Sequence, residues 1–218
     1  MLRLLTGAKS STAAPLVPSK PTLDSLRGAA ARCHACPLWK HATQTVFGEG
    51  LASARLVLVG EEPGNDEDLS GRPFVGPAGR LLDEALAEAG LSRADVYVTN
   101  VVKHFKWSAE GDRRVHQKPT GREVGACMPW LEAELLVLKP EVVLCLGSTA
   151  AQALLGKDFR VTQHRGQFVS SHPFAPLVGA TVHPSSILRT AGDAPRAEAR
   201  ASFVADLRLV AQALSLRA

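Results

Sequence analysis

The stretch that determines the fold class runs from Arg55 to Asp68 and reads RLVLVGEEPGNDED. Its first six residues form a short apolar run, rich in Val and Leu, that ends in glycine. Strands that are buried on both faces of a parallel sheet have this pattern. The acidic residues that follow, with glycine and proline among them, are typical of a loop. We therefore expect a buried parallel strand whose carboxyl end opens directly into a polar loop.

The rest of the chain alternates strand and helix signals. Further strands are expected at Val96–Val102, at Glu141–Gly147, and near Gln167 and Leu177. Helices are expected at 78–89, at 120–138, from Ser148 onward, and at Pro195–Leu216. This alternation predicts a three-layer α/β/α fold around a central, mainly parallel four-stranded sheet. Such sheets bind ligands beyond the carboxyl ends of their strands, so the loops after those ends are the first candidates for a site.

Composition supports a globular protein with one main domain. The chain has 218 residues, of which 45% are hydrophobic and 21% charged; we expect one domain over residues 24–218. Residues 1–23 contain no acidic residue. We expect a disordered extension there, with an organelle transit peptide as the alternative. No apolar run reaches about 18 residues, so no membrane partner is expected. We expect a monomer of bacterial type in the cytoplasm.

Charge and cysteine content leave the partner open. The formal net charge of +4 permits a nucleic acid as a partner but does not require one. Four Cys in this length are too few for a disulfide scaffold.

Three of the predicted loops carry unusual residues. The loop Gly60–Arg80 is rich in glycine, proline and acids but lacks the phosphate-loop pattern, so a solvated acidic loop is one interpretation. Against that interpretation, Phe74 stands alone among glycines, where its ring could stack on a flat ligand. Asn100 ends the second strand, where its amide either caps the turn or reads the edge of a base. His183 precedes Pro184 at another strand end and is either structural or functional.

Together these motifs resemble the uracil-DNA glycosylase superfamily, and in particular its iron–sulfur branch. The similarity is carried by GEEPGNDED, GRPFVGPAGRLLDEAL, VYVTNVVK, VLCLGSTAAQALLG and HPSSILR, in this order along the chain. It extends from about Cys33 to the C-terminal helix. The resemblance implies an enzyme that excises uracil from DNA and takes uracil-containing DNA, preferably single-stranded, as its partner.

One segment narrows the resemblance. Residues 111–119, GDRRVHQKP, are similar to the loop of the UdgX cross-linking glycosylases, which remain covalently attached to DNA through a loop histidine. The matching residue is His116. These relatives typically have Gln where this chain has Glu62, so a second carboxylate stands beside Glu61 and raises the pKa of one of the two. Without the surrounding motifs, a solvated basic loop would be the default interpretation.

The resemblance also implies roles for the residues of the site. Phe74 stacks on the base, Asn100 hydrogen-bonds the uracil edge, and His183 donates to O2 of the departing base. His116 captures C1′ of the sugar, while Glu61 orients His116 and takes up its proton. The remaining expected contacts are Glu62 with the uracil and Arg113, Arg114, Ser185 and Arg189 with the loop and the phosphates.

A metal site is expected near the N-terminal end of the domain. The spacing Cys33-x-x-Cys36 alone suggests zinc, with Cys127 and Cys145 as the other thiols. The resemblance instead implies a [4Fe–4S] cluster, whose expected ligands are Cys33, Cys36, His104 and Cys127. Cys145 is the alternative fourth ligand, but it lies in a predicted core strand.

Two rival functions remain at this stage. One is a conventional hydrolytic iron–sulfur glycosylase in which His116 is incidental. The other is a non-catalytic DNA-binding module of the same fold, against which the joint presence of Glu61, Phe74, Asn100 and His183 argues.

Overall fold

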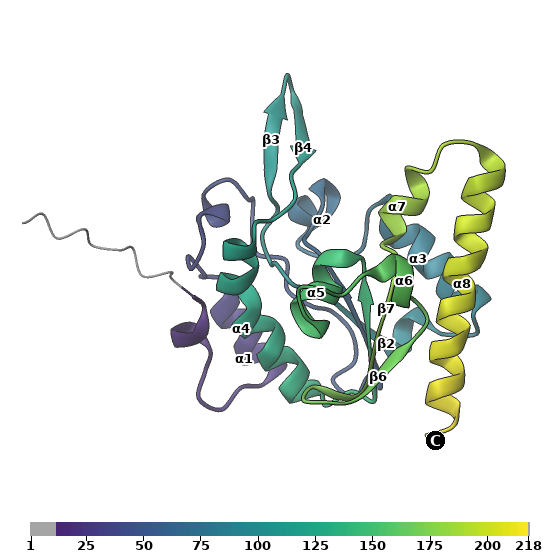
Figure 1. Cartoon of the computed structure of the whole chain (residues 1–218). Coiled ribbons are helices and arrows are strands. Elements are labelled where there is room, and N and C mark those ends of the chain that lie inside the picture. Colours follow the sequence, from purple (N-terminus) through teal and green to yellow (C-terminus); the bar gives the residue numbers. More distant parts are fainter. Residues whose placement is uncertain (1–11, 218) are drawn as a thin grey trace, which may run out of the picture.

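The computed structural model describes residues 12–217 and has a central sheet of five strands in the order β2-β1-β5-β7-β6 (Figure 1). The strands are β1 (Leu56–Gly60), β2 (Val96–Asn100), β5 (Val142–Leu146), β6 (Phe168–His172) and β7 (Ala175–Thr181). The first four in spatial order run parallel, and β6 pairs antiparallel with β7 at the edge. The predicted α/β class and mainly parallel sheet are confirmed, but the predicted number of strands, four, was wrong. The short run near Gln167 becomes the fifth strand, β6, because the chain turns after it and β7 runs back antiparallel along it.

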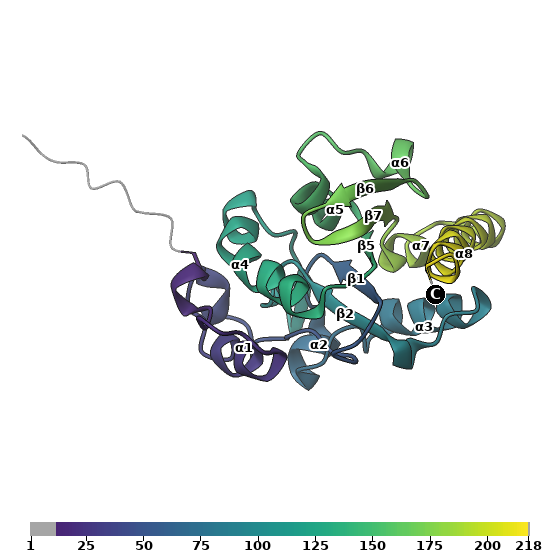
Figure 2. The ribbon, with the colours of Figure 1, turned by 90° about the horizontal axis from the view of Figure 1, so that it is seen from below.

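Helices cover both faces of the sheet, as expected for buried parallel strands. The longer helices are α1 (Leu23–Ala30), α3 (Pro77–Glu88), α4 (Gly121–Leu138), α5 (Ser148–Leu155) and α8 (Asp193–Ser215). The shorter ones are α2 (Asn65–Ser70), α6 (Val161–His164), α7 (Pro184–Leu188) and the 3-10 turns η1 (Ala14–Leu16), η2 (Pro37–Lys40) and η3 (Arg93–Asp95). Figure 2 shows α3, α7 and α8 on one side of the sheet and α1 and α4 on the other.

Alternate residues of the parallel strands enter two separate cores. Val57 and Val59 pack with α1, α4 and α5, whereas Leu56 and Leu58 pack with α3 and α8. Because every residue of β1 is buried, this strand reads as a continuous apolar run rather than as an alternating one.

A second, two-stranded sheet lies apart from the main one. Strands β3 (Trp107–Glu110) and β4 (Arg113–His116) form an antiparallel hairpin where the sequence suggested only a basic loop. Figure 1 shows the hairpin projecting from the body at the end where α2 and α7 lie. Because β1 leads into α2 and β7 into α7, this is the carboxyl end of the parallel strands.

Part of the expected N-terminal extension packs onto the body. The first eleven residues lie outside the described part of the chain. From there on, Ala13 is fully buried and its N–H donates to the carbonyl of Ala126 in α4 at 2.8 Å. Thr22 caps α1 through a reciprocal bond with Ser25, so helix α1 begins before the predicted domain start at residue 24. Among the described residues, no helix is long and apolar enough to cross a membrane.

Candidate active site

Three side chains from different loops meet at the carboxyl end of the sheet. Gly60 ends β1 and lies so close to Asn100 and Phe74 that a Cβ atom there would collide with both. The Phe74 and His183 rings are stacked with centroids 6.0 Å apart. A Cβ at Gly147, where φ is +93°, would come within 3.0 Å of His183. The structure thus brings together three of the four residues expected to contact the base; the fourth, Glu62, faces His116.

The loop that carries Phe74 is organised by a carboxylate that sequence reasoning did not single out. Glu67 accepts hydrogen bonds from the N–H groups of Gly64, Val75 and Gly76 at 2.8–3.0 Å. Phe74 itself has a φ of +56°, a left-handed conformation that is unfavourable for an aromatic residue. Backbone strain of this kind persists only where the surroundings fix it. The Glu67 contacts therefore hold the ring in place.

Asn100 presents a free acceptor to this site. Its Oδ1 atom is buried and has no hydrogen-bond donor among residues 12–217. A buried polar atom without a partner is costly, which points to a ligand that supplies the missing donor. The N3–H of uracil is such a donor, whereas cytosine carries an acceptor at the same position.

Asn100 is supported from below by Lys103, a residue that sequence reasoning missed. The buried Lys103 ammonium donates to the carbonyl of Asn100 at 2.8 Å and forms an ion pair with Glu134 in α4. Glu134 also accepts from the hydroxyls of Tyr97 and Thr99. This network fixes the end of β2. The sequence predicted helix α4 but did not indicate that its Glu134 would pair with Lys103.

The tautomer of His183 follows from its neighbours. The N–H of Ser185 points to Nδ1 of His183 at 3.2 Å, so Nδ1 accepts and the proton of the neutral ring lies on Nε2. Burial lowers the pKa of His183 to about 4, and Arg189 and His116 add to this effect. The ring is therefore a neutral Nε2–H donor at physiological pH. Ser185, expected to hold the loop or a phosphate, here orients this ring.

His116 ends β4 and faces two carboxylates from the β1 loop. Its Nε2 lies 3.0 Å from Glu62 Oε1 and 3.8 Å from Glu61 Oε1. Glu61 is instead hydrogen-bonded by Thr149 at the start of α5. The sequence predicted that Glu61 orients His116, but Glu62 is the carboxylate at hydrogen-bonding distance.

The two arginines of the hairpin have different surroundings. Arg114 forms an ion pair with the fully buried Asp68 at 2.6 Å and donates to Asn65 at 2.9 Å, so it fastens the hairpin to α2. Arg113 lies on the same strand and is exposed, as is Arg189 at the end of α7. Arg113 and Arg189 remain available to a phosphate backbone, whereas Arg114 is engaged within the protein.

The cysteines expected to hold a metal lie between α1, η2 and α4. Cys33, Cys36 and Cys127 are buried in one core cluster. The indole N–H of Trp130 points to the sulfur of Cys33, and the backbone N–H of Lys103 points to the sulfur of Cys127, each at 3.3 Å. Burial raises the pKa of Cys127 to about 12. Among the described residues no three ligands converge tightly enough to hold a metal ion as they stand. The three thiols and their N–H donors nevertheless suit a sulfur-rich cluster.

The fourth expected ligand is turned elsewhere. His104 is buried, and its Nε2 lies 3.0 Å from the Thr45 hydroxyl. Burial lowers the pKa of His104 to about 4, so the ring is neutral and keeps one lone pair for a metal. Cys145 lies in β5, and no other cysteine affects its pKa, which burial raises to about 12.

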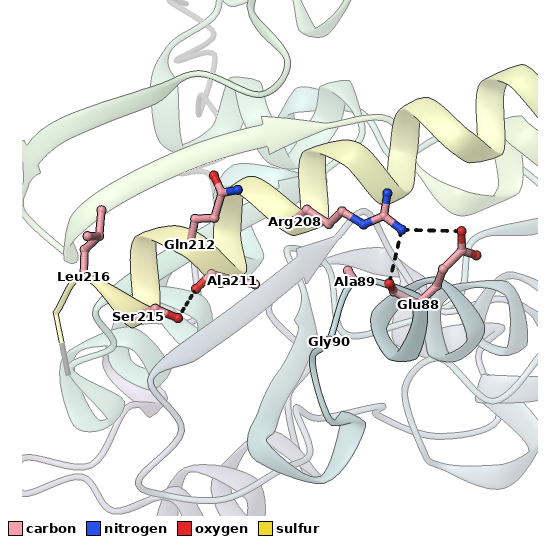
Figure 3. A pocket seen from close by; sticks show the side chains of 8 residues that line it. All are labelled: Glu88, Ala89, Gly90, Arg208, Ala211, Gln212, Ser215 and Leu216. Atoms are coloured by element: carbon pink, nitrogen blue, oxygen red, sulfur yellow. Dashed lines mark hydrogen bonds and ion pairs between the residues drawn. The ribbon is translucent and has the colours of Figure 1, made fainter.

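A separate pocket lies at the opposite end of the molecule. Figure 3 shows it between the end of α3 and the last turns of α8, where Arg208 approaches Glu88. None of the predicted site residues lines it.

The fold and the convergent loops define an α/β protein with a candidate ligand site beyond the carboxyl ends of its parallel strands. Residues 47–208 match the model of the uracil-DNA glycosylase superfamily, and the chain belongs to this family. It is 42% identical over 163 residues to the Type-4 uracil-DNA glycosylase of Thermotoga maritima, covering 72% of this chain and 79% of the relative. The Type-4 enzyme of Pyrobaculum aerophilum is 36% identical over 173 residues, covering 77% of this chain and 85% of the relative. A Type-5 uracil-DNA glycosylase of Thermus thermophilus is 35% identical over 153 residues, covering 63% of this chain and 62% of the relative.

Proposed function

We propose that this protein excises uracil from DNA and then becomes covalently linked through His116 to C1′ of the sugar. The observation that carries the proposal is the position of His116. It lies on a hairpin beyond the sheet, within 3.0–3.8 Å of two carboxylates, and near enough to lower the pKa of His183. This position supports a role for His116 as the nucleophile that acts after the base has left.

The first step is base departure. The base leaves the stack or comes from single-stranded DNA, which we propose as the preferred substrate. Phe74 stacks on the ring, and Asn100 Oδ1 accepts from N3–H. The Nε2–H of His183 donates to O2, so that the leaving uracil anion is stabilised where its charge develops. Loss of the base leaves a cationic sugar, as in other glycoside cleavage.

The second step is capture of the sugar. A lone pair of the His116 ring attacks C1′ and forms a C–N bond. The alkylated ring is cationic and lies beside Glu61 and Glu62. Arg113 and Arg189 bind the phosphates of the strand, and Arg114 keeps the hairpin in position.

We propose that Cys33, Cys36, Cys127 and His104 hold a [4Fe–4S] cluster. Replacing one thiolate by a neutral imidazole raises the reduction potential of such a cluster. The role of the cluster is structural, because it ties the segment around η2 to helix α4. The same helix carries Glu134, the partner of Lys103. We further propose a monomeric cytoplasmic protein with a single domain, in which the buried Ala13 and helix α1 belong to the body together with residues 24–218.

The test is a denaturing gel after incubation with single-stranded DNA that contains one uracil. At alkaline pH, wild-type protein shifts to a covalent adduct, whereas His116→Ser releases uracil and leaves an alkali-labile site without an adduct. Serine leaves room for water near C1′, and Glu61 can orient that water. An adduct that persists in His116→Ser refutes the assignment of the nucleophile.

A second candidate is a hydrolytic glycosylase, which the similarity to Type-4 enzymes favours. In that case wild-type protein gives only alkali-labile DNA. A non-catalytic DNA-binding module would give neither product.

A further inference from the structure

Glu62 is a buried carboxylate with one neighbour of opposite charge. Its side chain is 0% exposed, and neither oxygen has a well-aligned hydrogen-bond donor in the described part of the chain. A lone buried charge is strongly unfavourable, so such a group either takes up a proton or pairs with a cation. Among the described residues, the only ionisable side-chain nitrogen within ion-pair distance of the Glu62 carboxylate is Nε2 of His116, which lies 3.0 Å from Oε1.

His116 has a less uniform environment. Its side chain is 47% exposed at the base of the hairpin, and its ring centroid lies 6.1 Å from that of Phe105. Glu61 lies on the same side at 3.8 Å and also favours the protonated ring, whereas Arg189 opposes it. His183 is neutral in this pH range and adds no charge. Glu62 is therefore the dominant partner of His116.

One proton is shared by this pair near neutral pH. Burial raises the pKa of Glu62 to about 7, and the neighbouring Glu62 raises the pKa of His116 above its ordinary value. Two groups coupled this closely titrate as a unit. With the proton on the ring, His116 has no free lone pair on either nitrogen; with the proton on Glu62, the hydrogen bond engages Nε2.

We propose that Glu62 decides which nucleophile captures the sugar, because it holds this proton against His116 in the free protein. The inference rests on the proposed function. While the pair keeps its proton, the sugar that remains after base departure is captured by water. Once the pair has lost its proton, the free lone pair of His116 captures the sugar and the cross-link forms.

Atoms and electrons balance on both branches. In each, the C1′–N1 bond breaks and its electron pair leaves with uracil. In the cross-link, the lone pair of the neutral ring forms the C–N bond, and the resulting imidazolium is balanced by the Glu62 carboxylate. In hydrolysis, the water oxygen bonds to C1′ and its proton passes to Glu61.

The test measures the ratio of covalent adduct to free abasic site in single turnovers from pH 5.5 to 9. For wild-type protein the ratio rises by up to about tenfold per unit until the pair has lost its proton. In Glu62→Gln the carboxylate is absent, so the rise moves to lower pH by about one unit or more. Glu110→Gln, which removes an exposed carboxylate from the tip of the same hairpin, keeps the wild-type profile. The ratio is insensitive to the fraction of folded protein, since both products come from folded molecules.

A wild-type ratio that is above zero but flat, or an unshifted profile in Glu62→Gln, overturns the inference. Absence of the adduct at every pH overturns the proposed function instead. For that case, and for a Glu62→Gln protein that does not fold, an NMR titration of the His116 ring in the wild-type protein decides. A His116 midpoint at or below that of an ordinary exposed histidine refutes the shared proton.

Discussion

Replacing Arg114 by Met tests whether the hairpin is held by a single ion pair. The change keeps much of the side-chain volume but removes the guanidinium that lies 2.6 Å from Asp68. Asp68 is fully buried and, among residues 12–217, would retain only the N–H of Thr43, at 2.9 and 3.1 Å from its two oxygens. Removing one partner of a buried pair costs about 3–5 kcal/mol. Since Arg114 is 19% exposed, we expect the lower end, about 3 kcal/mol.

Two measurements follow from that magnitude. For a chain of this size, about 3 kcal/mol lowers the Tm by about 6–12 °C, which urea and thermal unfolding can measure. Because displacement of a reacting group by about 1 Å can cost about 100-fold in rate, adduct formation should fall by that order. Uracil release should change less, since Phe74, Asn100 and His183 are not on the hairpin. The matched control is Arg113→Met on the same strand, where the side chain is exposed and little stability is at stake. If Arg114→Met is no less stable than Arg113→Met, the ion pair does not hold the hairpin.

Three further predictions concern the remaining parts of the site. Cys33→Ala should lose iron and sulfide by chemical analysis and lower the Tm, whereas Cys145→Ala should keep both; a wild-type protein purified without iron and sulfide contradicts the cluster. Asn100→Ala should slow single-turnover uracil release by one to two decades, because a lost two-point base contact costs about 1–3 kcal/mol; an unchanged rate removes Asn100 from the site. The ring of His183 should show no NMR titration between pH 5.5 and 8, because its pKa is lowered to about 4 and it is neutral throughout; a midpoint within that range contradicts the assigned donor state.

Much of the fold could be predicted because short, local stretches of sequence indicate the central strands. Arg55–Gly60 and Glu141–Gly147 are apolar runs closed by glycine, and the helix after Thr120 begins at a capping box. The hairpin was missed because its strands are only four residues long and polar. The turn signal was nonetheless present: Gly111 has a φ of +58° between the paired residues of β3 and β4, as a two-residue hairpin turn requires.

The candidate site was predictable in its members but less so in its contacts. Strand ends and rare residue types pointed to Phe74, Asn100 and His183, which the structure brings together. That Glu62 rather than Glu61 approaches His116 depends on how a hairpin 54 positions further along the chain folds back. Local sequence contains no information on that geometry.

The projecting hairpin also bears on how such a protein can change over evolutionary time. No residue from Trp107 to His116 belongs to either hydrophobic core cluster. Substitutions, insertions or deletions in β3 and β4 therefore leave the packing of the central sheet untouched, apart from the contacts made by Trp107, Arg114 and His116. A lineage can therefore gain, lose or exchange the residue at the end of β4, the proposed nucleophile, while the loops around Phe74, Asn100 and His183 keep their geometry. The chemistry that follows base departure is thus free to diverge on a scaffold that does not have to be rebuilt.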